Sequence, residues 1–319
     1  MEVRKLIFIL WLLPFTIKSQ YTLIPDQNFE IVLKNLGYDY KIDGKVKTKK
    51  IKDVTSLVLN VTWFKKNSYD INEIEDLTGI EGFTSLTHLE IIGNHDMGSK
   101  LSVLDLSKNI ALKELHFDYH YGGLVENLDL SKNLALEILT CDGSGLKTLD
   151  VSKNSSLKFL DCTLNKLKTL DLSKLDSLEH LICTANMLKS LDISNNLALT
   201  SLGVYNNNIS HLDISKHISL SYLNCSLNQL TYLDVSKNTA LNALDCYDNQ
   251  LTSLDVSQNT ALYALSCSDN QLTNLDVSKN TALTELSCEN NKLSSLDLTN
   301  NKLIKYPHVR GNRFDKPIR

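Results

Sequence analysis

The chain has 319 residues, of which 42% are hydrophobic, and a formal net charge of −4. This length allows one to three domains, and the composition permits a substantial buried core. Lysines and acidic residues alternate without a long basic block, so a nucleic-acid partner is not expected. Proline occurs only at Pro14, Pro25, Pro307 and Pro317. Because linkers are commonly rich in proline, the gap between 25 and 307 favours one continuous structure.

Residues 1–20 have the features of a signal peptide. Arg4 and Lys5 precede an apolar run of ten residues, Leu6–Phe15. Ten residues are too few to cross a bilayer as a helix, which takes roughly 20. The sequence therefore predicts cleavage near Ser19 and a secreted, cell-envelope or periplasmic protein without a transmembrane segment.

Residues 21–55 are expected to form an N-terminal cap with a short helix from Pro25 to Gly37. Asp26 is a suitable N-cap, and glycine at the end can stop a helix. A solenoid needs such a cap because its first coil would otherwise expose a bare core. The apolar stripe of the helix comprises Phe29, Val32, Leu33 and Leu36.

A repeat with a period of 21 residues runs through much of segment 56–302. Successive cysteines are 21 residues apart, except for one gap of 42, and Val204 occupies the position that is skipped. Upstream, Ile91, Phe117 and Cys141 share this phase at spacings of 26 and 24, with insertions at 93–98 and 119–123. We expect about eleven coils. The cysteines are Cys141, Cys162, Cys183, Cys225, Cys246, Cys267 and Cys288.

The unit 241–261 shows the sequence pattern of the repeat. Its first half fits L-x-x-L-x-C-x-x-N-x-L, a leucine-rich-repeat signature, and its second half reads L-x-x-L-D-V-S-x-N. Strand alternation places Leu244 and Cys246 inside and Asp245 and Tyr247 outside, with neighbouring strands pairing in parallel about 4.8 Å apart. The predicted fold is a leucine-rich-repeat solenoid, a horseshoe or rod of mostly parallel β structure with little helix.

Polar residues also recur in columns. Inward asparagines are expected to bond the backbone groups exposed where each strand turns. Outward aspartates stacked every ~4.8 Å repel one another, so lysines or backbone donors should offset their charge. One asparagine column runs from Asn165 to Asn291, the other runs from Asn109 to Asn301 with Leu175 and His217 as interruptions, and the aspartates run from Asp105 to Asp297.

These units resemble the 21-residue class of bacterial leucine-rich repeats, and the cysteine phase is similar to internalin J-type repeats of Listeria. Residues 21–90 resemble the N-terminal part of secreted leucine-rich-repeat proteins of Bacteroidetes, through Ile24–Glu30, Asp43–Val46 and Asp76–Phe83. The resemblance implies an exported or surface-exposed binding protein, in some members an adhesin.

Three chemical roles are open to the cysteines. A disulfide needs converging Cβ atoms about 3.8 Å apart, whereas equivalent side chains on parallel strands point the same way. A zinc motif needs ligands two to four residues apart, and no two cysteines are that close. The pattern therefore favours a structural ladder of buried free thiols over disulfides or a metal.

No catalytic, cofactor or metal site is expected from the motifs. His116 and His120 come closest to a metal-binding pair but lack an evident third ligand. The loop Asp39–Gly44 has Lys41 where calcium needs an oxygen, and calcium between the stacked aspartates lacks the glycine-rich nonapeptide of calcium-binding solenoids. Neither G-x-S-x-G nor a glycine-rich phosphate loop occurs.

The outward positions of the cysteine-bearing strands vary between units, unlike the L-D-V-S half. Exposed aromatic residues on neighbouring coils would provide anchors for a partner, although scattered surface aromatics are also normal. We expect a non-catalytic monomer that binds a protein, or alternatively a cell-envelope carbohydrate, with residues 303–319 as a tail that partly covers the last coil. The candidate partner-binding residues are Phe159, Tyr205, Tyr222, Tyr247 and Tyr263, beside Asp161, Ile182 and Asp245.

Overall fold

The computed structural model describes residues 20–60, 73–92, 100–102, 104–118, 125 and 127–315. The expected signal peptide and both predicted insertions, 93–98 and 119–123, lie outside the described residues, apart from Gln20 at the end of the first. Within the described part, none of the helices combines the length and the apolar character that a membrane crossing requires.

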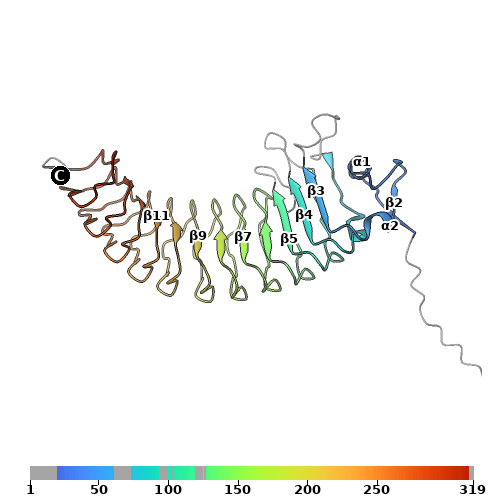
Figure 1. Ribbon diagram of the computed structural model, residues 1–319, viewed down its shortest axis with the longest axis horizontal. Helices are drawn as coiled ribbons and strands as arrows, with labels where there is room; N and C mark the ends of the chain where they lie inside the picture. Colours follow the sequence, from blue (N-terminus) through green and yellow to red (C-terminus); the bar gives the residue numbers. More distant parts are fainter. Residues whose placement is uncertain are drawn as a thin grey trace, which may run out of the picture.

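Eleven parallel strands form one sheet in sequence order, and the strands lie side by side in a curved row (Figure 1). This confirms the predicted leucine-rich-repeat solenoid of parallel strands with little helix. Each strand bonds only its neighbours in the chain, so the core is continuous along the row. The strands are β3 (Ser56–Asn60), β4 (His88–Ile92), β5 (Glu114–Asp118), β6 (Ile138–Thr140), β7 (Phe159–Asp161), β8 (His180–Ile182), β9 (Ser201–Gly203), β10 (Tyr222–Asn224), β11 (Ala243–Asp245), β12 (Ala264–Ser266) and β13 (Glu285–Ser287).

The N-terminal end is covered by β1 (Tyr21–Leu23), α1 (Gln27–Asn35), β2 (Lys45–Lys47) and α2 (Thr48–Ile51), and η2 (Ile80–Gly82) precedes β4. The Asp26 carboxylate caps α1 by accepting from the Phe29 amide at 2.9 Å. Its second oxygen accepts from the amides of Glu75 and Asp76, which ties the cap to the first coils. Phe29, Val32 and Leu33 are buried as expected, whereas Leu36 at the helix end is 37% exposed.

The cysteine column lies in the core. All seven thiols are free and buried, in line with Val204 at the position without cysteine. Burial raises the pKa of each thiol, to about 12 for Cys183 and Cys225. A thiol that stays protonated in an apolar core packs as a small hydrophobic side chain.

The first asparagine column joins consecutive coils. The Asn186 amide nitrogen donates to the carbonyl of Cys162 in the preceding coil at 2.9 Å and to that of Cys183 in its own coil at 3.2 Å. Its amide oxygen accepts from the Leu167 backbone N–H at 3.0 Å. The same pattern recurs at equivalent positions, so these side chains satisfy buried backbone groups where each strand turns.

The second asparagine column does the same where the L-D-V-S segment turns. Asn259 donates to the carbonyls of Val235 and Asn238 at 3.0 and 2.8 Å. At the interruption, the buried His217 takes the same place and its Nε2 lies 3.1 Å from the Ile193 carbonyl oxygen.

The exposed aspartates are stabilised by backbone donors. Each of the ten accepts a bond from the N–H two residues further along the chain, as Asp255 does from Ser257 at 2.9 Å. These turns hold the pKa of the carboxyls below the ordinary value, as at Asp234 and Asp255. The expected compensation for the stacked charges therefore comes from the backbone.

A further column was not visible in the sequence. One residue per coil, two positions after the cysteine phase, has a positive φ of 51–54°. A positive φ usually calls for glycine, yet seven coils have another residue at this position. These residues are Leu164, Ala185, Asn206, Leu227, Asp248, Asp269 and Asn290. Gly143 begins the column and Gly311 continues it beyond the last strand.

The solenoid hydrogen bonding extends past 302, the boundary placed from the sequence. The Cys288 N–H donates to the His308 carbonyl at 2.8 Å, and Ser287 and His308 form a parallel bridge. Asn312 continues the first asparagine column through the Cys288 carbonyl at 2.9 Å. Val309 stands 21 residues after Cys288, so 303–315 forms a degenerate additional coil that Pro307 and the scarcity of leucine conceal in the sequence.

Candidate binding surface

The variable side of the solenoid is made by the outward side chains of the strands, which we call the strand face. Strand alternation places two of them on each three-residue strand, on either side of a buried leucine. Parallel pairing stacks equivalent positions of successive coils into columns. The strand face comprises His88, Glu114, Ile138, Phe159, His180, Ser201, Tyr222, Ala243, Ala264 and Glu285 in one column and Glu90, His116, Thr140, Asp161, Ile182, Gly203, Asn224, Asp245, Ser266 and Ser287 in the next, with the residue after each cysteine phase beside them.

Two of the predicted tyrosines lie together. Tyr205 and Tyr247 each come directly after the cysteine position of their coil, and these two coils are separated by one other coil. Their ring centroids are 6.1 Å apart at an interplanar angle of 53°. Between them the intervening coil has the buried Ser226, whose hydroxyl accepts from the Tyr247 N–H at 3.1 Å. A serine at that place leaves room for the rings to approach. Burial is the main cause that raises the pKa of Tyr247 to about 12, and the hydrogen bond with the Tyr205 hydroxyl is the second.

The other predicted aromatics lie in different columns. The Tyr222 hydroxyl is 3.5 Å from a carboxylate oxygen of Asp245, and burial raises the pKa of both groups. Tyr263 precedes its strand and is 48% exposed. Phe159 packs beside His180, with centroids 6.0 Å apart, towards the N-terminal half of the row. The five aromatics thus include one close pair, Tyr205 and Tyr247, whereas Phe159 packs beside a histidine and Tyr222 beside a carboxylate.

A groove of about 570 Å³ lies beside these tyrosines at the C-terminal end of the strand face. Its floor comes from β12, β13 and Asp245 of β11, and its wall comes from the additional coil, with Leu303, Lys305, Tyr306 and His308. Tyr306 is 84% exposed. The groove is not evident from the sequence, which predicts only a tail at 303–319 that partly covers the last coil.

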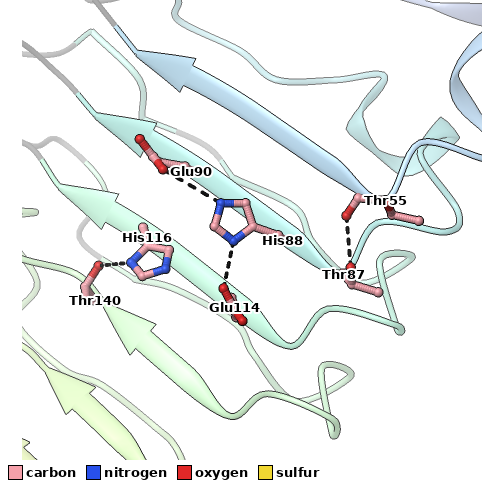
Figure 2. A network of polar contacts seen from close by, with 7 residues as sticks. All are labelled: Thr55, Thr87, His88, Glu90, Glu114, His116 and Thr140. Carbon is pink, nitrogen blue, oxygen red and sulfur yellow. Dashed lines mark hydrogen bonds and ion pairs between the residues drawn. The ribbon is translucent and has the colours of Figure 1, made fainter.

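A cluster of ionisable side chains occupies the opposite end of the strand face (Figure 2). The strand register pairs His88 with Glu114 and Glu90 with His116. Each histidine therefore lies opposite a glutamate of the neighbouring strand. His88 Nδ1 lies 2.9 Å from a Glu114 carboxylate oxygen, and its Nε2 lies 3.7 Å from a Glu90 oxygen. His116 Nδ1 lies 3.1 Å from the Thr140 hydroxyl.

The environment favours a neutral imidazole at His116. Desolvation is the main cause that lowers the pKa of His116 below 6.5, and the charge of the neighbouring His88 is the second. The cluster was also overlooked in the sequence, where His116 was paired with His120, a residue outside the described part. The 26-residue spacing of Ile91 and Phe117 in fact places H-x-E on β4 opposite E-x-H on β5.

The parallel sheet, the 21-residue unit and the two asparagine columns are those of a leucine-rich-repeat solenoid built from 21-residue units. The chain is similar to the functional domain of internalin J from Listeria monocytogenes, described as including a cysteine ladder, with 32% identity and a TM-score of 0.81. The similarity covers 94% of this chain and 64% of that one, so the chain spans less than two thirds of that protein's length.

Two further structures share the fold. Internalin F from Listeria monocytogenes is 23% identical with a TM-score of 0.76, over 91% of this chain and 83% of that one. A plant receptor-kinase ectodomain from Arabidopsis thaliana, in complex with Casparian strip integrity factor 2, is 21% identical with a TM-score of 0.65, over 82% and 33%. No protein-family model matches the chain. No curated protein matches it either.

Proposed function

We propose that this chain is an exported, non-catalytic binding protein that engages a protein partner through the C-terminal half of the strand face. The observation that carries the proposal is the Tyr205–Tyr247 pair, two half-buried rings held against each other on an outward surface. Aromatic side chains that are already held in place lose little conformational freedom when a partner covers them, so they are effective anchors.

The surroundings of the pair support a protein ligand. Tyr222 and Tyr263 add aromatic area, and Asp245 supplies a carboxylate for a polar contact. The adjoining groove of about 570 Å³ lies within the range of ligand sites and could receive a protruding side chain or a short peptide segment. A leucine-rich-repeat ectodomain with this fold is described in complex with another factor, so the fold can serve as a scaffold for binding.

Export rests on residues 1–20, where a basic start precedes a ten-residue apolar run. A carbohydrate of the cell envelope is the second candidate ligand, because tyrosine rings beside a carboxylate also suit a sugar. A glycan array distinguishes this alternative, since strong hits that disappear in the tyrosine variant would replace the protein partner.

Affinity capture with the full chain tests the main proposal. The variant replaces Tyr205, Tyr222, Tyr247 and Tyr263 with serine, and Tyr232→Ser is the matched control, because Tyr232 is 62% exposed on the other half of its repeat. We expect the fourfold variant to lose the captured protein while the control retains it. Unchanged capture by a fourfold variant with unchanged thermal unfolding would refute this surface.

A further inference from the structure

We propose that His88, Glu114 and His116 bind a divalent transition-metal ion, Zn²⁺, at the N-terminal end of the strand face. These residues each offer one ligand atom, and the three atoms all lie within 4.8 Å of one another. They come from two adjacent strands, so the backbone hydrogen bonds of the sheet fix their spacing. This site is separate from the tyrosines at the other end of the row.

The distances are compatible with tetrahedral zinc. Zinc bonds nitrogen and carboxylate oxygen at about 2.0–2.2 Å, which places neighbouring ligand atoms roughly 3.4 Å apart. His88 Nδ1 and the Glu114 oxygen are now 2.9 Å apart, and the rings of His88 and His116 are 5.4 Å apart between centroids. Small side-chain rotations therefore suffice to bring the three atoms around one ion, without movement of the strands.

The groups behind the ligands also fit a metal site. A metal-binding histidine usually donates its other ring N–H to an oxygen, which fixes the ring. The Thr140 hydroxyl at 3.1 Å from Nδ1 provides this for His116, and its other nitrogen turns towards Glu114 and His88 (Figure 2). Glu90 is placed to do the same for His88, with its oxygen 3.7 Å from Nε2.

The donor set selects the ion. Two imidazoles and one carboxylate suit zinc and related transition metals, whereas calcium and magnesium prefer oxygen ligands. All three side chains are partly exposed, so an ion can enter from solvent. Three protein ligands leave the fourth position for water.

Titration calorimetry with zinc chloride, on full chain freed of metal by chelation, tests the site. We expect one ion per chain. The His116→Gln and His88→Gln variants should each weaken binding by more than about 100-fold, and Thr140→Val, which removes an outer partner, by about 10-fold. His180→Gln is the matched control, since His180 lies on the same face beside Phe159 and should bind zinc as the unchanged chain does. Unchanged circular dichroism establishes that each variant is folded.

Cobalt substitution separates this site from the seven buried thiols. Nitrogen and oxygen ligands give weak visible bands, whereas thiolate ligands add an intense near-ultraviolet charge-transfer band. The proposal expects the visible bands alone, and their loss in the His88→Gln, His116→Gln double variant. Absence of zinc uptake at millimolar metal, unchanged affinity in the double variant, or a thiolate band would each overturn it.

Discussion

Replacing Asn228 with alanine tests whether the first asparagine column holds neighbouring coils together. Its amide oxygen accepts from the Ile209 backbone N–H at 2.9 Å. Its amide nitrogen lies 2.9, 3.2 and 3.1 Å from the carbonyl oxygens of Val204, Cys225 and Ser226. The side chain is 9% exposed, so water replaces few of these bonds after the substitution.

The loss can be estimated from these contacts. The Ile209 N–H is left without its amide partner in the core, which costs about 1–3 kcal/mol. The two amide hydrogens make two bonds at a time, each contributing about 1 kcal/mol. The carbonyls suffer less than the N–H, because those of Val204 and Cys225 keep the amides of Asn207 and Asn249 as second donors. The sum is roughly 4 kcal/mol of unfolding free energy.

Urea unfolding followed by circular dichroism measures this loss. Asn208→Ala is the control, because the side chain of Asn208 is exposed to solvent, and it should change stability by less than about 0.5 kcal/mol. Asn228→Asp should be at least as damaging as alanine, since it removes the donors and buries a charge. A decrease in the Asn228→Ala variant no larger than that of the control would refute the role assigned to the column.

The remaining predictions concern the turns, the thiols and the stacked carboxyls. Ala185 has a φ of 51°, so Ala185→Gly should stabilise the chain by about 0.5–1 kcal/mol in urea unfolding, and a destabilisation would contradict the strain at that column. Cys225→Ser should cost about 1–3 kcal/mol by burying an unpartnered hydroxyl, whereas Cys225→Val should be close to neutral because Val204 fills the equivalent place; equal effects would argue against an apolar column. Alkylating reagents should leave the native thiols unmodified and react after unfolding, because burial keeps them protonated; rapid reaction of native protein would show otherwise. The exposed aspartates have folded pKa values below the ordinary 3.8, so their contribution to stability is present above that value and is lost as pH falls through the folded pKa values. The urea midpoint should therefore decrease on acidification below about pH 4, and a midpoint unchanged down to pH 2 would contradict the turns.

The sequence predicted the features that are set by one repeated local environment. Leu244 and Cys246 had to face inward, and an asparagine had to lie at the strand turn, because every coil places these positions against the same neighbours. The period alone therefore determined the parallel sheet, the buried thiols and the inter-coil hydrogen bonds. Strand alternation placed Phe159 and Tyr222 on the outward side of β7 and β10, where both are half-buried.

The features that the sequence did not predict depend on which coil lies beside which. The Tyr205–Tyr247 contact spans two coils and needs Ser226 between them, so a list of outward aromatics did not identify the pair. The left-handed column was hidden because the chain uses Leu, Ala, Asn and Asp there in place of glycine. Packing of the neighbouring coils is strong enough to impose this backbone, at a cost of about 1–2 kcal/mol for each such residue.

The separation of invariant and variable positions has a physical origin that bears on both proposals. An inward side chain contacts the coils on both sides, and a change there leaves a cavity or an unbonded backbone group. An outward side chain contacts few atoms, so it can change with little effect on folding. The same sheet spacing that holds the core also brings outward side chains of adjacent coils within contact distance. Any two coils can therefore acquire a joint site, aromatic at Tyr205 and Tyr247 or metal-binding at His88 and His116, without altering the repeat that supports it.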